Sequence, residues 1–255
     1  LNHIGAIASG YQADLLIMSD IKNIEIKQVY HAGKRVIPKE IKKHDVPEKL
    51  LHTVHIRMDS EDELRLPLKS SKTRIMEVIP GEILTKELIE DVQVKDGFFA
   101  ADDTFQKIAV IERHHATGKK GLGIVKGFSI KNGAIASTVG HDSHNLIVVG
   151  DNDSDMFRAI KALEKCGGGY AVVKSGEEPE ILPLEVMGLI SKNSHEEVKK
   201  QLAVMIEKAR SLGVPETIAP FITLSFLALP VIPQIRVTTR GVYSVDDGCF
   251  YPVSY

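Results

Sequence analysis

The 255-residue sequence predicts an α+β fold in which short strands outnumber helices. Three observations support this prediction. Short apolar runs separated by glycine, proline and other turn residues are typical of strands. Two segments carry apolar residues at helical spacing between capping residues, as amphipathic helices do. A single strand–helix–strand unit over residues 146–176 indicates one right-handed βαβ crossover.

The first segment, residues 1–37, is predicted to be all-β. Its run ADLLIMS suits a strand buried on both faces, and IEIKQVYHAGKRV alternates and then turns at Ala32-Gly33 as a hairpin. The charged, proline-containing segment IPKEIKKHDVPEK indicates a domain boundary near residues 38–50. Because an isolated hairpin is marginally stable, we expect these strands to complete a larger sheet. The start lacks methionine and signal-peptide features, so we expect a fragment or a processed product.

From residue 51 onward, strands and helices are mixed. The first helix is expected to begin after the N-cap Asn152 and to end at the glycines of CGGG. The second is expected to begin at Ser194, which forms a capping box with Glu197, and to end at Gly213. The predicted strands are residues 51–58, 74–79, 107–113, 133–139, 146–150, 170–176 and 179–185.

The composition excludes several classes of function. The net charge of −2 provides no basic field for nucleic acid or an anionic membrane. The most apolar segment, residues 220–233, is 14 residues long and carries three prolines. A membrane span needs about 20 apolar residues, so we expect a buried core segment, with an oligomer interface as the alternative. Cys166 and Cys249 form no CxxC pair and fit a reducing cytoplasm.

Two motifs resemble known sites but fail on spacing. DNDSD at 151–155 imitates an EF-hand loop, yet Met156 and Ala162 occupy the positions that need Gly and Glu. We therefore interpret it as a helix N-terminus. The glycines of 118–127 fit neither a dinucleotide nor a phosphate-loop motif, which predicts a turn or a hairpin. No HxH or CxxC pair occurs anywhere in the sequence.

Histidines cluster at the ends of two predicted strands, where sites are often built. ERHHATG follows the run KIAVI, and HDSHN follows GAIASTVG. Adjacent histidines on a strand point to opposite faces, so at most one of His114 and His115 enters a given site. The candidate site residues are Glu112, His114 or His115, His141, Asp142, His144 and Asn145.

These side chains allow three interpretations. They are of the types that bind a divalent metal. They also suit hydrogen bonding to a polar heterocycle, with Asp142 orienting an imidazole. The third interpretation is an exposed strand end and a polar turn in which Asp and Asn redirect the chain.

The stretch GAIASGYQADLLIMSD, followed by VYHAGKRV, resembles the closing strands of the amidohydrolase superfamily, which complete a small β-sandwich. The segment from IERHHATG to VGDND, with GGGYAVV, LPLEVMGLIS and PFITLSFLALPVIP, resembles the C-terminal region of the bacterial adenine deaminase family. The resemblance covers essentially the whole chain. It implies sandwich strands in residues 1–45 and a mixed α/β C-terminal domain in residues 50–255.

The resemblance implies a metal-dependent aminohydrolase that converts adenine to hypoxanthine and ammonia in purine salvage. In this family a (β/α)₈ barrel binds a divalent metal (manganese, iron or zinc) that activates water. The barrel is expected to precede this chain, so the primary metal ligands lie outside it and the chain alone is expected to be inactive. His141 and His144 are candidates for a secondary metal site.

The same resemblance implies a position for the candidate residues. Barrel active sites open at the C-terminal ends of the strands, so Glu112, His114, His141, Asp142, His144 and Asn145 are expected to face that opening, near the substrate. The expected partners are adenine, the N-terminal barrel portion and further copies in a homo-oligomer, without nucleic acid or membrane, in the cytoplasm. Two alternatives stay open: a related amidohydrolase acting on another purine or a cyclic amide, and a non-catalytic binding or assembly module.

Overall fold

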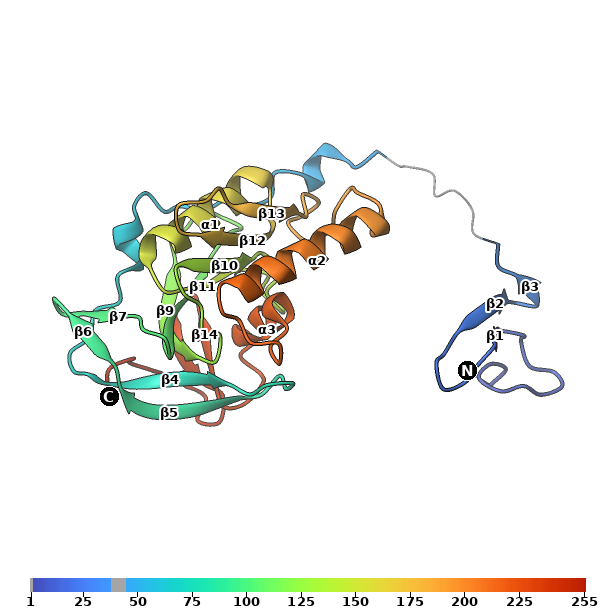
Figure 1. The fold of residues 1–255 in the computed structure, drawn as a ribbon, viewed down its shortest axis with the longest axis horizontal. Coiled ribbons are helices and arrows are strands. Elements are labelled where there is room, and N and C mark those ends of the chain that lie inside the picture. Colours follow the sequence, from blue (N-terminus) through green and yellow to red (C-terminus); the bar gives the residue numbers. More distant parts are fainter. Residues whose placement is uncertain (1, 38–44) are drawn as a thin grey trace. The chain divides into compact units, whose positions relative to one another are not determined.

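The computed structural model describes residues 2–37 and 45–255. The chain divides into two compact units, Leu1–Asp45 and Val46–Tyr255. Most of the predicted boundary segment, residues 38–44, lies outside the described residues. The predicted α+β class is confirmed, because the described part of the second unit combines an eight-stranded sheet with three α-helices (Figure 1).

The first unit is a small antiparallel sheet with the order β1-β2-β3. Its strands are β1 (Leu15–Met18), β2 (Ile26–His31) and β3 (Lys34–Arg35). The hairpin prediction is confirmed, since Ala32 and Gly33 join β2 to β3 with positive φ values of 48° and 75°. The predicted burial of β1 on both faces is wrong for this unit, because Leu16 and Ile17 are 53% and 46% exposed and the three short strands form a single layer. Its place in an amidohydrolase sandwich stays a prediction.

The large sheet of the second unit has the strand order β13-β12-β10-β11-β8-β9-β4-β5. Its strands pair antiparallel except for the parallel pair β4 and β9. In chain order they are β4 (Lys72–Val78), β5 (Thr85–Asp91), β8 (Phe105–Ile111), β9 (Lys120–Lys126), β10 (Gly133–Ser137), β11 (Leu146–Gly150), β12 (Gly169–Lys174) and β13 (Glu180–Pro183). The hairpin prediction for residues 118–127 is confirmed, because β8 and β9 form that hairpin.

Smaller elements surround this sheet. The strands β6 (Gln93–Lys95) and β7 (Phe98–Ala100) form a two-stranded ribbon. A C-terminal sheet contains β14 (Ile235–Thr238), β15 (Gly241–Ser244) and β16 (Cys249–Tyr251). The 3₁₀ turns η1 (Glu48–Leu50) and η2 (Glu61–Leu64) precede β4. The C-terminal sheet was not predicted from the sequence.

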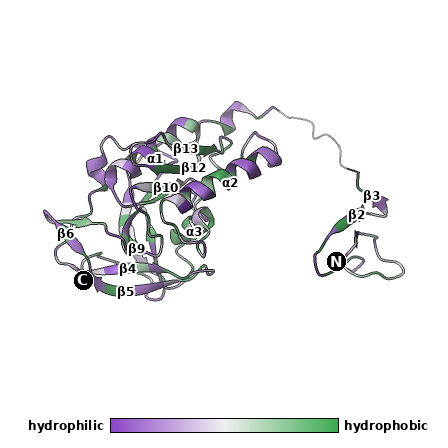
Figure 2. Cartoon of the chain, viewed as in Figure 1, coloured by the Kyte–Doolittle hydropathy of each residue, from purple (hydrophilic) through white to green (hydrophobic). Residues whose placement is uncertain are grey.

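Both predicted helices are present and are capped as expected. Helix α1 (Asp153–Cys166) begins after Asn152, whose side chain accepts a hydrogen bond from the Asp155 amide at 2.8 Å. It ends at Gly167 with φ 83°, a left-handed cap that favours glycine. Helix α2 (His195–Ser211) begins with the predicted capping box of Ser194 and Glu197. Along α2, hydrophilic and hydrophobic segments alternate (Figure 2), as expected for a helix with one buried face.

A third helix, α3 (Pro220–Leu227), was not predicted. It occupies the first eight residues of the apolar segment 220–233, whose prolines and prevailing hydrophobicity gave no helical period. Phe221, Leu224 and Leu227 are buried, as predicted for this segment, but Ile222 and Val231 are 64% and 67% exposed. Among the described residues, no helix has the length and apolar character needed to cross a membrane.

The sheet has a helical layer on each face. Ile108 and Val110 of β8 belong to a core cluster that includes residues of α2 and α3, whereas Ala109 and Ile111 belong to a cluster that includes residues of α1. Alternate residues of a strand point to opposite faces, so α1 covers one face and α2 with α3 the other. The predicted crossover β11–α1–β12 is present, with β10 lying between its two parallel strands.

The strand predicted at residues 51–58 is absent. The segment is extended and its side chains alternate, with Val54, Ile56 and Met58 buried. These three side chains pack in the same cluster as the core residues of α1. The segment thus packs on the face of the sheet that α1 covers. Its His55 amide donates to the Arg113 carbonyl at 2.7 Å, but the segment forms no ladder of strand hydrogen bonds, so the alternation reflects burial alone.

Candidate functional site

The two histidine clusters are brought together because β8 and β11 are neighbours in the sheet. Ile111 at the end of β8 pairs with Leu146 at the start of β11. The residues just after β8 therefore lie beside the residues just before β11. His114 joins the two segments directly, because its Nε2 atom lies 2.8 Å from the Ser143 carbonyl oxygen. His115 is exposed; its backbone amide donates to Glu112, and its ring lies 6.3 Å from the His114 ring.

Glu112 organises the turn between β8 and β9. One carboxylate oxygen accepts hydrogen bonds from the amides of His114 and His115 at 2.5 and 2.8 Å. The other accepts bonds from the amide and hydroxyl of Thr117 at 3.0 and 2.8 Å. Burial raises the pKa of Glu112, but the bonds from Thr117, His114 and His115 outweigh it and lower the pKa to about 2. Glu112 is therefore ionised at neutral pH, and both oxygens are engaged in shaping the turn.

The loop of residues 138–145, which we call the HDSHN loop, is fixed at both ends. Thr138 Oγ1 donates to the Gly188 carbonyl at 2.7 Å and accepts from the Gly169 amide at 2.7 Å. In the middle of the loop, the His141 amide donates to the Ser225 carbonyl of α3 at 2.9 Å. The His141 ring lies 5.5 Å from the Phe226 ring, and its Nδ1 atom lies 2.6 Å from an Asp142 carboxylate oxygen. Asp142 thus orients the imidazole, as the sequence suggested.

Arg113 supports the HDSHN loop from the protein interior, and this role was not predicted from the sequence. Its side chain is buried, with 1% of the residue exposed. The guanidinium donates to the His144 carbonyl, to the Met187 carbonyl at 3.2 Å and, more weakly, to the Thr138 carbonyl at 3.4 Å. No carboxylate among the described residues forms an ion pair with it. Burial lowers the pKa of Arg113 to about 10 against the opposing effect of Glu112, and the group stays charged.

His144 lies half-buried above Arg113. Its Nδ1 atom is buried without a hydrogen-bond partner. Burial lowers the pKa of His144, and the charges of Arg113, His141 and His114 lower it further, against the smaller effect of Asp142. His144 is therefore neutral at neutral pH. A neutral imidazole with a vacant nitrogen is suited to accept or donate one hydrogen bond.

The predicted secondary metal site lacks a third ligand in the structure. Within residues 2–37 and 45–255, no three His, Cys, Asp or Glu side chains are arranged to hold a metal ion. His141 is paired with Asp142, and the His144 carbonyl accepts a hydrogen bond from Arg113. The described residues therefore offer no complete ligand set for a metal ion.

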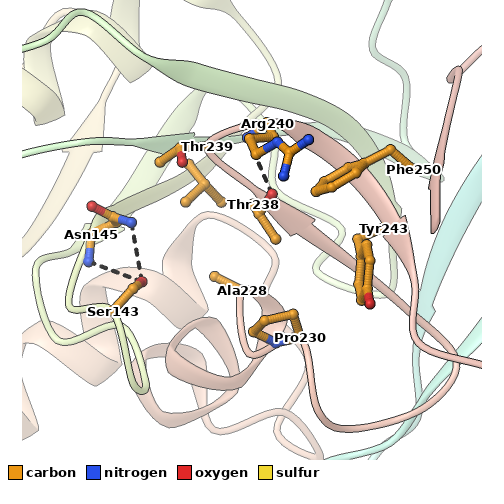
Figure 3. A pocket seen from close by; sticks show the side chains of 10 residues that line it. Ser143, Asn145, Ala228, Pro230, Thr238, Thr239, Arg240, Tyr243 and Phe250 are labelled. Carbon is orange, nitrogen blue, oxygen red and sulfur yellow. Dashed lines mark hydrogen bonds between the residues drawn. The ribbon is translucent and has the colours of Figure 1, made fainter. Parts of the chain in front are cut away.

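A pocket of about 370 Å³ opens beside the HDSHN loop (Figure 3). Ser143 and Asn145 form one side, and Arg240, Tyr243 and Phe250 of the C-terminal sheet form the opposite side. The Asn145 amide nitrogen donates to Ser143 Oγ at 3.1 Å, but its oxygen is buried without a partner. The complete lining is Val110, Ser143, Asn145, Ala228, Pro230, Thr238, Thr239, Arg240, Tyr243 and Phe250.

The pocket lining combines a charged group, an amide and aromatic rings. The Arg240 guanidinium lies 4.3 Å from the centre of the Phe250 ring and forms a cation–π contact with it. Asn145 offers an amide with a vacant acceptor. A volume of a few hundred Å³ with aromatic walls and a few polar groups is typical of a site for a small organic molecule.

Gly121 explains how the β14–β15 turn reaches this pocket. A Cβ atom at Gly121 would lie 1.9 Å from the Thr238 carbonyl oxygen and 2.5 Å from the Gly241 amide. Only glycine allows the turn to approach β9 so closely. The sequence signal for this side of the pocket was the alternation in IRVTTRGVYSV with a central Arg-Gly turn, which had not been assigned to strands.

The sequence was compared with known families and curated proteins. Residues 82–249 match the family described as "Adenine deaminase C-terminal domain". The chain is 41% identical to "Adenine deaminase" of Desulfitobacterium hafniense (strain Y51), an alignment that covers 98% of this chain and 44% of the relative. It is 42% identical to "Adenine deaminase" of Clostridium acetobutylicum (96% and 44% coverage) and 40% identical to that of Geobacillus kaustophilus (98% and 45%). The chain thus spans less than half the length of these relatives.

Proposed function

Because the chain belongs to the adenine deaminase C-terminal domain family, we propose that it is the C-terminal part of an adenine deaminase. That enzyme hydrolyses adenine to hypoxanthine and ammonia. The observation that carries the proposal is the match over residues 82–249, together with relatives of this name that align with nearly the whole chain. The N-terminal portion that these relatives carry outside the alignment is the proposed partner.

The pocket beside the HDSHN loop supplies a chemical reason to place the purine near this chain. Adenine presents an amino donor and a ring-nitrogen acceptor side by side, and an asparagine amide pairs with both. Asn145 has a buried oxygen that lacks a donor, and a small rotation of its side chain toward the pocket would let this oxygen accept the adenine amino group. Tyr243 and Phe250 add aromatic surface against which a planar base can pack.

The remaining candidate residues have different roles in this proposal. His144, with its vacant nitrogen, and His141, oriented by Asp142, face the reaction partner as hydrogen-bonding groups. His114 supports the loop through Ser143. Glu112 acts on the turn and does not contact adenine, since its oxygens accept four hydrogen bonds from the protein.

The divalent metal, manganese, iron or zinc, is proposed to be held by the N-terminal portion, because the described residues offer no ligand group of their own. A bound divalent ion lowers the pKa of a coordinated water. The first unit is proposed to contribute its strands to the amidohydrolase β-sandwich. Location in the cytoplasm and homo-oligomer formation are further parts of the proposal, the former consistent with two unpaired cysteines.

The test is a chimera in which this chain replaces the aligned region of the Geobacillus kaustophilus relative. We expect the chimera to release ammonia and hypoxanthine from adenine, and this chain alone to release neither. The relative without its aligned region is the matched control for the contribution of this chain. Robust deamination by this chain alone would overturn the proposal, as would a folded chimera that leaves adenine intact.

A further inference from the structure

An apolar surface lies around α3 that the proposed function does not use. We call it the α3 face and define it by Ile83, Leu84, Ile222 and Val231. These side chains are 50%, 42%, 64% and 67% exposed. Ile83, Leu84 and Ile222 line one shallow groove between α3 and the β4–β5 connection. Val231 lies two residues before Pro233, whose carbonyl accepts a hydrogen bond from the Thr85 amide beside this groove at 3.2 Å. Scattered exposed apolar residues are normal, but a group of them in one region marks an interaction surface.

The sequence of α3 makes this exposure unusual. Phe221, Leu224 and Leu227 point into the core on one side of the helix, while Ile222 points outward. Six of the eight α3 residues are apolar, and a predominantly apolar helix is normally buried on most sides. The outward side of α3 is therefore a surface without a cover among the described residues of the second unit.

The α3 face is continuous with the candidate site. Phe226 lines the groove of the α3 face and also contacts the His141 ring at 5.5 Å. The backbone of the HDSHN loop is bonded to α3 through His141 and Ser225. A protein surface that covers the α3 face is thereby brought next to His141 and Asp142.

We propose that the α3 face binds the N-terminal portion that the curated relatives carry outside the aligned region. That portion amounts to more than half of each relative, since the chain covers 44% and 45% of their lengths. The proposal rests on the proposed function and adds the surface through which the two parts meet. The alternative occupant is a second copy of this chain.

The test uses the full-length chimera with p-benzoylphenylalanine, a photoreactive residue, in place of Val231. Equal amounts of ¹⁵N-labelled and unlabelled chimera are mixed before irradiation, and the cross-linked peptides are identified by mass spectrometry. We expect cross-links to the N-terminal portion within one copy. The same residue in place of Val204, which is 45% exposed on α2, is the matched control and should give no such cross-links.

A second substitution tests whether the contact is apolar. Ile222→Glu would bring an unpaired charge into the interface, so the cross-link yield from position 231 should fall by about tenfold or more. Val204→Glu should leave the yield unchanged. In this chain alone, Ile222→Glu should leave the melting temperature unchanged, because position 222 is mostly exposed there.

The possible results separate the two proposals. Cross-links between labelled and unlabelled copies, or none to the N-terminal portion, would overturn the assignment of the α3 face. A chimera that deaminates adenine but gives either of these results would support the proposed function and contradict only the assignment of the α3 face. A chimera that forms the expected cross-links but leaves adenine unchanged has the interface and lacks the proposed activity.

Discussion

Arg113→Met is expected to loosen the HDSHN loop more than it destabilises the protein. The substitution removes the donors to the His144 and Met187 carbonyls and a weak one to Thr138. A hydrogen bond from a charged group contributes roughly 1.5 kcal/mol or more, so the two stronger bonds amount to about 3 kcal/mol. Thr138 retains its other bonds to Gly169 and Gly188, so the loss falls mainly on the loop.

An opposing effect limits the change in global stability. Burial lowers the pKa of Arg113 from 12.5 to about 10, which corresponds to about 3 kcal/mol against the buried charged form. Methionine fills a similar path through the core without that cost. The free energy of unfolding is therefore expected to change by less than about 2 kcal/mol. Arg113→Lys should not restore the loop, because one ammonium group cannot span the separated carbonyls as a guanidinium does.

The assay combines hydrogen exchange with urea denaturation. Exchange of the His141 and His144 amides, which donate to Ser225 and Gly140, should accelerate by about 100-fold, the equivalent of about 3 kcal/mol. Arg236→Met is the matched control. Arg236 is also fully buried, donates to Thr85, Ile83 and Pro233, and has a pKa lowered to about 10 by burial.

The control should accelerate exchange near β5 and β14 and leave the HDSHN loop protected. Two results would refute this reasoning. Unchanged protection of the loop in Arg113→Met would mean that the guanidinium does not order it. A parallel loss of global stability and loop protection would mean that Arg113 acts on the whole fold.

Three further predictions concern single positions. Asn145→Ala in the chimera should lower kcat/KM for adenine roughly 3- to 10-fold, the value of one hydrogen bond, and an unchanged value in steady-state kinetics would remove Asn145 from the site. Glu112→Gln should remove one pH dependence of the free energy of unfolding. The pKa of Glu112 in the folded state is about 2, below the ordinary 4.5. Its stabilising contribution is therefore present above pH 4.5 and is lost as pH falls toward 2. After allowance for solvent screening this amounts to about 1–2 kcal/mol, and identical acid titrations of both proteins would contradict it. Gly121→Ala should lower the free energy of unfolding, measured in urea, by roughly 3 kcal/mol, because the new Cβ atom would clash with the backbone of Thr238 and Gly241. The control is Gly176→Ala, where no atom lies within 4 Å of the new Cβ atom. A smaller loss in Gly121→Ala than in the control would be inconsistent with this reasoning.

The elements that were predicted correctly carry their signal locally. The caps Asn152 and Ser194 and the glycine after α1 act within one helical turn, so α1 and α2 could be located from the sequence. The segment 51–58 has the alternation of a strand, but its backbone partner would have to come from a distant strand, and it packs against α1 instead. Helix α3 carries no clear period because Ile222 on its exposed side is as apolar as the buried Phe221 and Leu224.

The candidate site was likewise predictable from the sequence only in part. The residue types and the positions at strand ends were visible in the sequence, but the neighbour relation of β8 and β11 was not. That relation brings His114 to Ser143 and leaves His115 outside the contact. Arg113 was overlooked because an arginine beside two histidines appears to be one more polar residue of an exposed strand end. Only the three carbonyls around it, from segments far apart in the chain, reveal its role.

Neighbouring polar residues of the two clusters therefore contact different parts of the chain. Glu112 and Arg113 are adjacent in sequence, yet the first binds backbone amides of its own turn and the second binds carbonyls of other loops. Both charged groups are thus engaged with backbone atoms of the turn and the loop. Within the HDSHN loop, His144 Nδ1 and Asn145 Oδ1 are buried and have no hydrogen-bond partner among the described residues. These two side chains lie on a support in which Glu112 and Arg113 are already hydrogen-bonded to the backbone, which is the arrangement that keeps a binding group in place before its ligand arrives.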